Sequence, residues 1–129
     1  MSNKKILIVE DDADMRLVYQ FLLTAHDYDT FFAADAISAV SEAVKHRPNL
    51  ILLDLGLPAG GGFLVLQRFR ANLNLALIPV IVVSGRDSPD TKELALKAGA
   101  KAFVQKPWVE NELLAIIRQL LGQPNPSVA

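Results

Sequence analysis

The chain has 129 residues, a length typical of one compact domain. Hydrophobic residues make up 51% and charged residues 21%, which is a globular composition and excludes a disordered chain. The formal net charge of −1 excludes the basic footprint of a nucleic-acid binder and a polybasic membrane patch. With no cysteine, the sequence also excludes disulfides, thiolate catalysis, iron–sulfur clusters and cysteine-ligated zinc.

No apolar run reaches the roughly 18 residues of a membrane span. The apolar run 6–9 that follows the basic N-terminus is too short for the core of a signal peptide. We therefore expect a soluble, cytoplasmic protein.

The first half of the chain alternates between strand and helix patterns. The β-branched run 6–9 predicts a strand buried on both faces, 28–33 predicts a second strand, and 50–53, ending at Asp54, a third. Between them, apolar side chains recur at helical spacing: Met15, Val18, Leu22 and Ala25 within 14–26, and Ile37, Val40 and Val44 in a helix capped by Asp35 and ended by Pro48.

The second half continues the alternation. Glycines and prolines in 56–62 predict a loop, and a helix follows over 63–73. Strands are expected over 79–83 and 102–104. The helix between them begins at Ser88–Pro89 and ends at Gly99, and a last helix covers 108–121. This order is a (βα)5 chain, which predicts a doubly wound, five-stranded parallel sheet in a three-layer α/β/α architecture.

Chemically active side chains follow the strands of this sheet. Glu10 and Asp11 follow the first strand, Asp54 ends the third, Ser84 ends the fourth and Lys106 follows the fifth. Ligands of open α/β sheets bind at the carboxyl ends of the strands, so we expect these groups to share one edge. Crowded carboxylates suit Mg²⁺ or Mn²⁺, and a carboxylate beside such an ion can attack a phosphoryl group. The sequence therefore predicts phosphorylation of an aspartate. The ammonium of Lys106 and the hydroxyl of Ser84 would be donors to the negatively charged phosphoryl oxygens.

Four segments at these strand ends resemble the receiver domains of two-component response regulators: Ile6–Asp12, Leu52–Pro58, Val82–Gly85 and Gly99–Pro107. The resemblance runs from about Lys4 to Leu121, so we expect a receiver domain over 1–121 and a C-terminal tail or the start of a linker over 122–129. It implies a flavodoxin-like, CheY-like fold and the function of a phospho-acceptor signalling switch.

The resemblance also implies a role for each matching residue. Asp54 is the phospho-acceptor, Ser84 and Lys106 bind the phosphoryl group, Phe103 is the switch aromatic, and Arg86 modulates the lifetime of the phosphoryl group. The metal ligands are Glu10 (through water), Asp11, Asp54 and the backbone carbonyl of Gly56, with Mg²⁺ or Mn²⁺ as the ion. Phosphorylation would move Ser84 and Phe103 and remodel the face of the fourth helix, fifth strand and fifth helix.

The implied partners are a sensor histidine kinase or a phosphotransfer protein, and a downstream effector or attached output domain. Neither nucleic acid nor membrane is expected to bind directly. The chain is not an enzyme in the usual sense, because it catalyses only its own phosphoryl transfer and dephosphorylation.

Three other functions are weighed against this one. A haloacid-dehalogenase-type phosphatase needs an acid two residues after its aspartate, where this chain has Gly56. A flavodoxin-type FMN carrier needs a phosphate loop after the first strand, where Glu10 and Asp11 would repel the phosphate. A receiver used only as a docking module would not need the full set of site residues.

Overall fold

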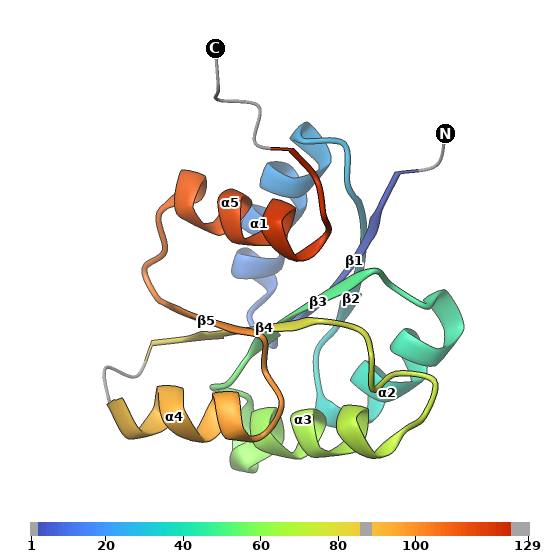
Figure 1. Ribbon diagram of the computed structural model, residues 1–129, viewed down its shortest axis with the longest axis vertical. Helices are drawn as coiled ribbons and strands as arrows, with labels where there is room; N and C mark the ends of the chain where they lie inside the picture. The colour runs from blue at the N-terminus through green and yellow to red at the C-terminus, as the bar shows by residue number, and fades with distance from the viewer. Residues whose placement is uncertain (1–2, 86–88, 125–129) are drawn as a thin grey trace.

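The computed structural model describes residues 3–85 and 89–124. Within them, five parallel strands form one sheet in the order β2-β1-β3-β4-β5, and helices connect the strands (Figure 1). The strands are β1 (Lys5–Val9), β2 (Asp29–Ala33), β3 (Leu50–Asp54), β4 (Val80–Ser84) and β5 (Ala102–Gln105). The helices are α1 (Ala13–Ala25), α2 (Ala36–His46), the 3₁₀ turn η1 (Pro58–Gly60), α3 (Gly61–Ala71), α4 (Pro89–Lys97) and α5 (Glu110–Leu120).

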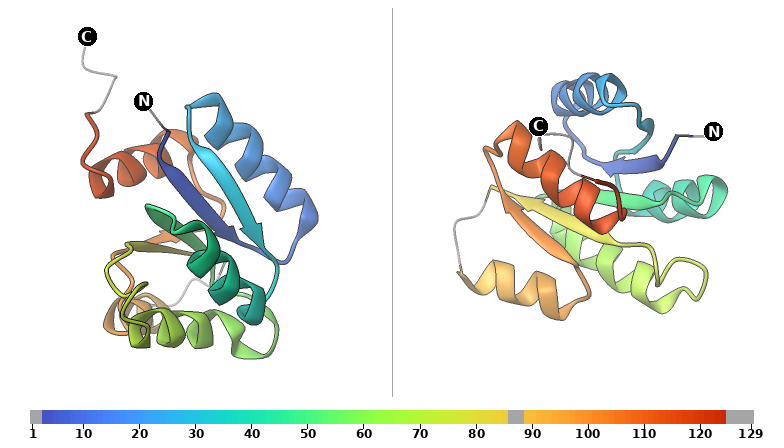
Figure 2. Two further views of the ribbon diagram at one scale, coloured as in Figure 1. Left: turned by 90° about the vertical axis from the view of Figure 1, so that its right-hand side faces the viewer. Right: turned by 45° about the horizontal axis from the view of Figure 1, so that its top comes forward.

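Helices cover both faces of the sheet and make three layers. Helices α1 and α5 lie on one face, and α2, α3 and α4 lie on the other (Figures 1 and 2). This arrangement is the predicted doubly wound (βα)5 fold, which is therefore confirmed. None of the helices in the described ranges has the length and apolar character needed to cross a membrane.

The sheet has a separate apolar core on each face, which explains the unbroken apolar runs of the strands. In β1, Ile6 and Ile8 join the core beneath α1 and α5, while Leu7 and Val9 join the core beneath α2, α3 and α4. All four are at most 1% exposed. Each such side chain contributes about 1.5–3 kcal/mol by leaving water, so both cores fix the central strands firmly.

Two helices begin two residues away from their predicted starts. Helix α3 begins at Gly61 instead of residue 63, because Gly61 and Gly62 are buried helical residues and not part of a loop. Helix α5 begins at Glu110 instead of residue 108, because the backbone of Val109 is extended, with φ −91° and ψ 129°. The ring of Trp108, just before it, stacks on Tyr19 of α1 at a centroid distance of 5.4 Å.

Candidate functional site

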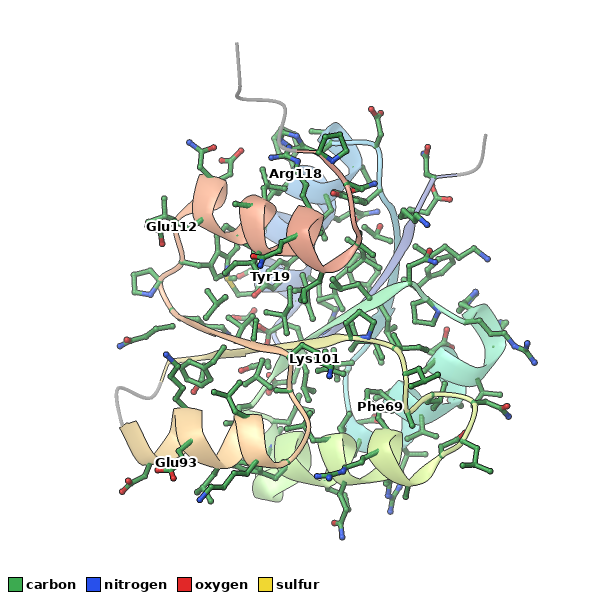
Figure 3. The ribbon with its side chains drawn as sticks, in the orientation of Figure 1. Tyr19, Phe69, Glu93, Lys101, Glu112 and Arg118 are labelled. Atoms are coloured by element: carbon green, nitrogen blue, oxygen red, sulfur yellow. The ribbon has the colours of Figure 1, made fainter. Side chains whose placement is uncertain are left out.

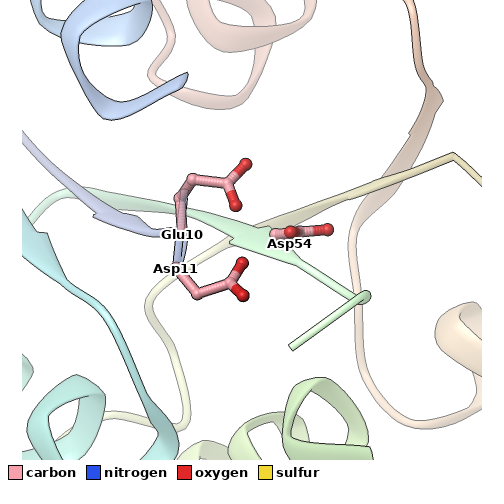
Figure 4. A group of neighbouring side chains, drawn as sticks. All are labelled: Glu10, Asp11 and Asp54. Atoms are coloured by element: carbon pink, nitrogen blue, oxygen red, sulfur yellow. The ribbon is translucent and has the colours of Figure 1, made fainter. Parts of the chain in front are cut away.

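Three carboxylates meet at the carboxyl edge of the sheet. Glu10 and Asp11 directly follow β1, and Asp54 is the last residue of the neighbouring strand β3. Each residue has an oxygen atom within 4.8 Å of the oxygens of the other two. Figure 4 shows the three side chains converging from the two strand ends. The structure thus brings together the acids that the sequence placed at one edge.

Lys106 supplies a positive charge to this group. Its Nζ atom lies 3.0 Å from Glu10 Oε1 and 3.5 Å from Asp54 Oδ2. The lysine follows β5 directly, and its backbone N–H donates to the carbonyl oxygen of Ser84 at 2.8 Å. The pairing of β4 with β5 therefore continues up to the site and fixes where the ammonium group lies.

Asp54 is 8% exposed, and a charge at the end of a buried strand needs compensation. Its Oδ1 atom accepts a hydrogen bond from the backbone N–H of Gly56 at 2.9 Å, while Oδ2 faces Lys106. A Cβ atom on residue 56 would lie 3.3 Å from Oδ1. The glycine thus keeps a side chain from crowding the carboxylate.

Burial and neighbouring charges change the acid–base properties of the site. Burial raises the pKa of Glu10 to about 7; a hydrogen bond with Asp54 adds to the rise and the hydrogen bond from Lys106 opposes it. Burial alone would lower the pKa of Lys106, but the carboxylates of Glu10 and Asp54 outweigh it and raise that pKa. At neutral pH the lysine is therefore charged while Glu10 is close to the midpoint of its titration.

Ser84 and Phe103, two further predicted site residues, lie on the neighbouring strands β4 and β5. Ser84 is buried at the end of β4, opposite Gln105 of β5. Phe103 pairs in register with Val82 and is partly buried against the core beneath α2, α3 and α4. Arg86, the predicted modulator, lies outside the described residues.

Sequence reasoning missed two contacts near the acids. Arg16 of α1 donates from Nη1 to the carbonyl oxygen of Glu10 at 2.8 Å. The indole N–H of Trp108 donates to the hydroxyl of Tyr19 at 3.1 Å, and Tyr19 lies in the layer of α1 and α5 (Figure 3). One signal was available for the first contact: Arg16 is the first basic residue after a run of four acids within 10–14.

The donor set at this edge is suited to a hard cation. Carboxylate oxygens from Glu10, Asp11 and Asp54 are the ligands that Mg²⁺ prefers, and the softer ligands that select zinc or copper are missing from this group. Asp11 is exposed, so the cluster opens to solvent on one side. The acidic group also fits the phosphorylation site of a receiver domain.

Sequence comparisons agree with this geometry. The family model described as "Response regulator receiver domain" matches residues 6–118. The phosphate regulon transcriptional regulatory protein PhoB of Escherichia coli is 31% identical over 123 residues, which are 95% of this chain and 54% of PhoB. The transcriptional regulatory protein PrrA of Mycobacterium tuberculosis is 33% identical over 121 residues, 94% of this chain and 51% of PrrA. The chain thus spans about half the length of these curated relatives.

Solved structures give the same result. The receiver domain of a sensor histidine kinase from Pseudomonas aeruginosa, solved with magnesium in its active site cleft, superimposes with a TM-score of 0.86 at 30% identity and covers 95% of this chain and 100% of that one. The BeF3-activated receiver domain of RstA from Klebsiella pneumoniae has a TM-score of 0.86 at 28% identity, covering 93% and 100%. Since the family model, the fold and the acidic edge all agree, this chain belongs to the response regulator receiver domains of two-component systems.

Proposed function

We propose that the chain is a phospho-accepting switch in which Asp54 receives a phosphoryl group from a sensor histidine kinase or a phosphotransfer protein. One observation carries this proposal: the carboxylate of Asp54 is held at a strand end with Lys106 Nζ 3.5 Å from Oδ2 and two further acids beside it. A carboxylate next to cationic groups in a partly buried site is a suitable nucleophile for phosphorus.

The transfer step is a displacement at phosphorus. An oxygen of Asp54 forms a bond to phosphorus while the bond from phosphorus to the imidazole nitrogen of phosphohistidine breaks. The electron pair of the broken bond stays on that nitrogen, and Asp54 becomes an acyl phosphate. The ammonium of Lys106 and the hydroxyl of Ser84 are the groups of this chain that would neutralise and bind the phosphoryl oxygens.

A divalent cation completes the charge balance in this proposal. Glu10, Asp11, Asp54 and the backbone carbonyl of Gly56 would hold Mg²⁺, or Mn²⁺ in its place. Bound there, the ion supplies positive charge beside the phosphoryl oxygens. The cluster of three acids beside a single ammonium supports this assignment, because the negative charge of the carboxylates is only partly offset.

The switch follows from new charge at Asp54. A phosphoryl group adds strong acceptor oxygens, which would draw in the hydroxyl of Ser84 and the ammonium of Lys106. Movement at the end of β4 would leave room for Phe103 to rotate inward, and the surface of α4, β5 and α5 would change shape. A downstream effector or an attached output domain that prefers the new surface would stabilise the phosphorylated form in return.

The test is intact-protein mass spectrometry after incubation with acetyl phosphate, with and without Mg²⁺. We expect one added phosphoryl group that depends on Mg²⁺ and is lost in Asp54→Asn. The matched control is Asp14→Asn, which changes an exposed acid of α1 and should accept the phosphoryl group like the wild type.

A missing adduct in the wild type would have two readings, which a beryllofluoride titration separates. A response of Trp108 fluorescence to beryllofluoride would indicate an acyl phosphate that hydrolyses too quickly to detect. If no adduct forms and beryllofluoride does not change the fluorescence of Trp108, the results would contradict the switch and favour a docking module built on the receiver fold.

A further inference from the structure

We propose that Arg16 is a positioning residue that holds the turn carrying Glu10 and Asp11 in the shape needed to bind the divalent cation. The proposal rests on the proposed function, because it concerns the same cation. It starts from the 2.8 Å hydrogen bond between Arg16 Nη1 and the main-chain carbonyl of Glu10. That carbonyl belongs to the peptide group joining the two acids, so its orientation determines where the side chain of Asp11 points.

Every polar group of Glu10 in this turn has a partner. The N–H of Glu10 donates to Ala33 of β2 at 2.9 Å, and the Glu10 carboxylate receives Lys106 on one oxygen and the N–H of Asp12 on the other. Arg16 holds the remaining polar atom of Glu10, its carbonyl oxygen. Since Asp11 is exposed and comes next in the chain, the carbonyl contact is the restraint that acts most directly on its position.

Arg16 itself is well placed for this task. It lies in the first half of α1 and its own N–H donates to the carbonyl of Asp12 at 3.0 Å, so its backbone is part of the helix that the turn leads into. Its side chain is half-buried, and a guanidinium stays charged at every physiological pH. The turn is thus held by a donor that stays charged throughout the pH range in which carboxyl groups titrate.

Two effects of Arg16 on cation binding have opposite signs. Holding the ligands in place strengthens binding, whereas a second positive charge nearby weakens it. A half-exposed charge is screened by water and salt, so its repulsion changes the affinity by roughly two- to fivefold. Loss of a group that orients metal ligands costs about ten- to a hundredfold in affinity. We therefore expect the positioning effect to dominate.

The test is a Mg²⁺ titration followed by the fluorescence of Trp108, the single tryptophan of the chain. Arg16→Met keeps the length of the side chain without charge or donor and should weaken binding roughly tenfold. Arg16→Lys keeps the charge and one donor and should recover most of the affinity. Arg70→Met is the matched control, because Arg70 makes the same kind of bond, from Nη1 to the carbonyl of Lys97 at 3.0 Å, away from the acids.

A second measurement separates positioning from a general loss of structure. In phosphorylation by acetyl phosphate, Arg16→Met should need about ten times more Mg²⁺ for half-maximal rate and regain the wild-type rate at saturating Mg²⁺. Thermal unfolding in EDTA checks that the variant is folded. If Arg16→Met does not fold, Arg16→Ala, which also removes the donor, takes its place: a roughly tenfold loss of Mg²⁺ affinity supports the proposal, and an affinity within about twofold of the wild type overturns it.

The outcomes distinguish this proposal from the proposed function. If the wild type binds Mg²⁺ and Arg16→Met binds within about twofold of it, or more tightly, the positioning role is overturned and the switch stands. A wild type that neither binds Mg²⁺ nor takes up a phosphoryl group would overturn both.

Discussion

Glu10 is a buried acid whose pKa lies well above that of a free carboxyl group. It is 1% exposed, and burial together with Asp54 raises its pKa from 4.5 to about 7. At pH values between 4.5 and about 7, Glu10 of the folded protein holds a proton that the same side chain has released in the unfolded chain. The folded state therefore binds more protons in this range, and its stability falls as the pH rises.

The first prediction concerns this pH dependence. In EDTA, the free energy of unfolding should decrease between about pH 4.5 and pH 7, by up to about 3 kcal/mol from Glu10. Glu10→Gln cannot release a proton and should show a flatter profile, measured by urea unfolding at several pH values. The raised pKa of Lys106 acts above pH 10.5 and leaves this window unchanged. Equal slopes for both proteins would contradict the assignment.

Site residues could be predicted from the sequence where a strand end fixes them. Glu10, Asp54 and Lys106 each follow or end an apolar run, so the topology alone brings them together. The contact of Arg16 could not be predicted in this way, because it depends on how α1 is rotated about its axis. The roles of all the predicted site residues, those of Ser84, Phe103 and Arg86 included, stay predictions.

At the scale of elements, α2 shows why helical periodicity can mislead. The predicted apolar positions include Ile37 and Val44, yet these side chains are 76% and 47% exposed. Ala39 and Ala43 are buried instead. Small side chains let α2 approach the sheet and α3 closely, whereas two of the larger apolar side chains that dominate the sequence pattern are exposed. The helix was predicted correctly, but of its three predicted apolar positions only Val40 packs against the core, where it is partly buried.

The start of α3 gives the second prediction. Alanine normally stabilises a helix over glycine by about 1 kcal/mol. At residue 62, however, a Cβ atom would lie 2.7 Å from the backbone of Leu55, just after the site strand β3. Gly62→Ala should therefore lower the free energy of unfolding by about 1–3 kcal/mol in a urea titration.

Gly61→Ala is the matched control for this prediction. It lies in the same helical turn, and its Cβ atom would meet the side chain of Leu57 at 3.3 Å, where a small adjustment relieves the contact. We expect a smaller loss of stability than for Gly62→Ala. The reverse order would contradict the packing argument.

At the scale of the whole molecule, the parallel sheet connects the site to a distant surface. The ammonium of Lys106 contacts Glu10 and Asp54. In the chain, Lys106 follows β5 and precedes α5. The strand order and the shared edge were predictable from the alternation of strands and helices. The stacking of Trp108 on Tyr19, which joins the loop after β5 to α1, was not, since it depends on the packing of two layers.

The third prediction tests this connection. Addition of beryllofluoride with Mg²⁺ should change amide hydrogen exchange in 102–105 and 110–120 of the wild type, and Lys106→Ala should reduce the change. Lys101→Ala, an exposed lysine just before β5, is the control and should respond normally. Binding of beryllofluoride is checked separately by fluorine NMR. A Lys106→Ala variant that binds it and shows the full change would contradict a coupling role.

The strand order also has a consequence for biosynthesis. Strands β2, β1 and β3 are complete once residue 54 has been made; β4 then lies beside β3, and β5 lies beside β4, in the order of the chain. Since proteins are made from the N-terminus, Glu10, Asp11 and Asp54 are synthesised before Lys106. Vectorial synthesis therefore makes the residues of the anionic part of the site first, and the lysine that pairs with them follows the last strand of the sheet.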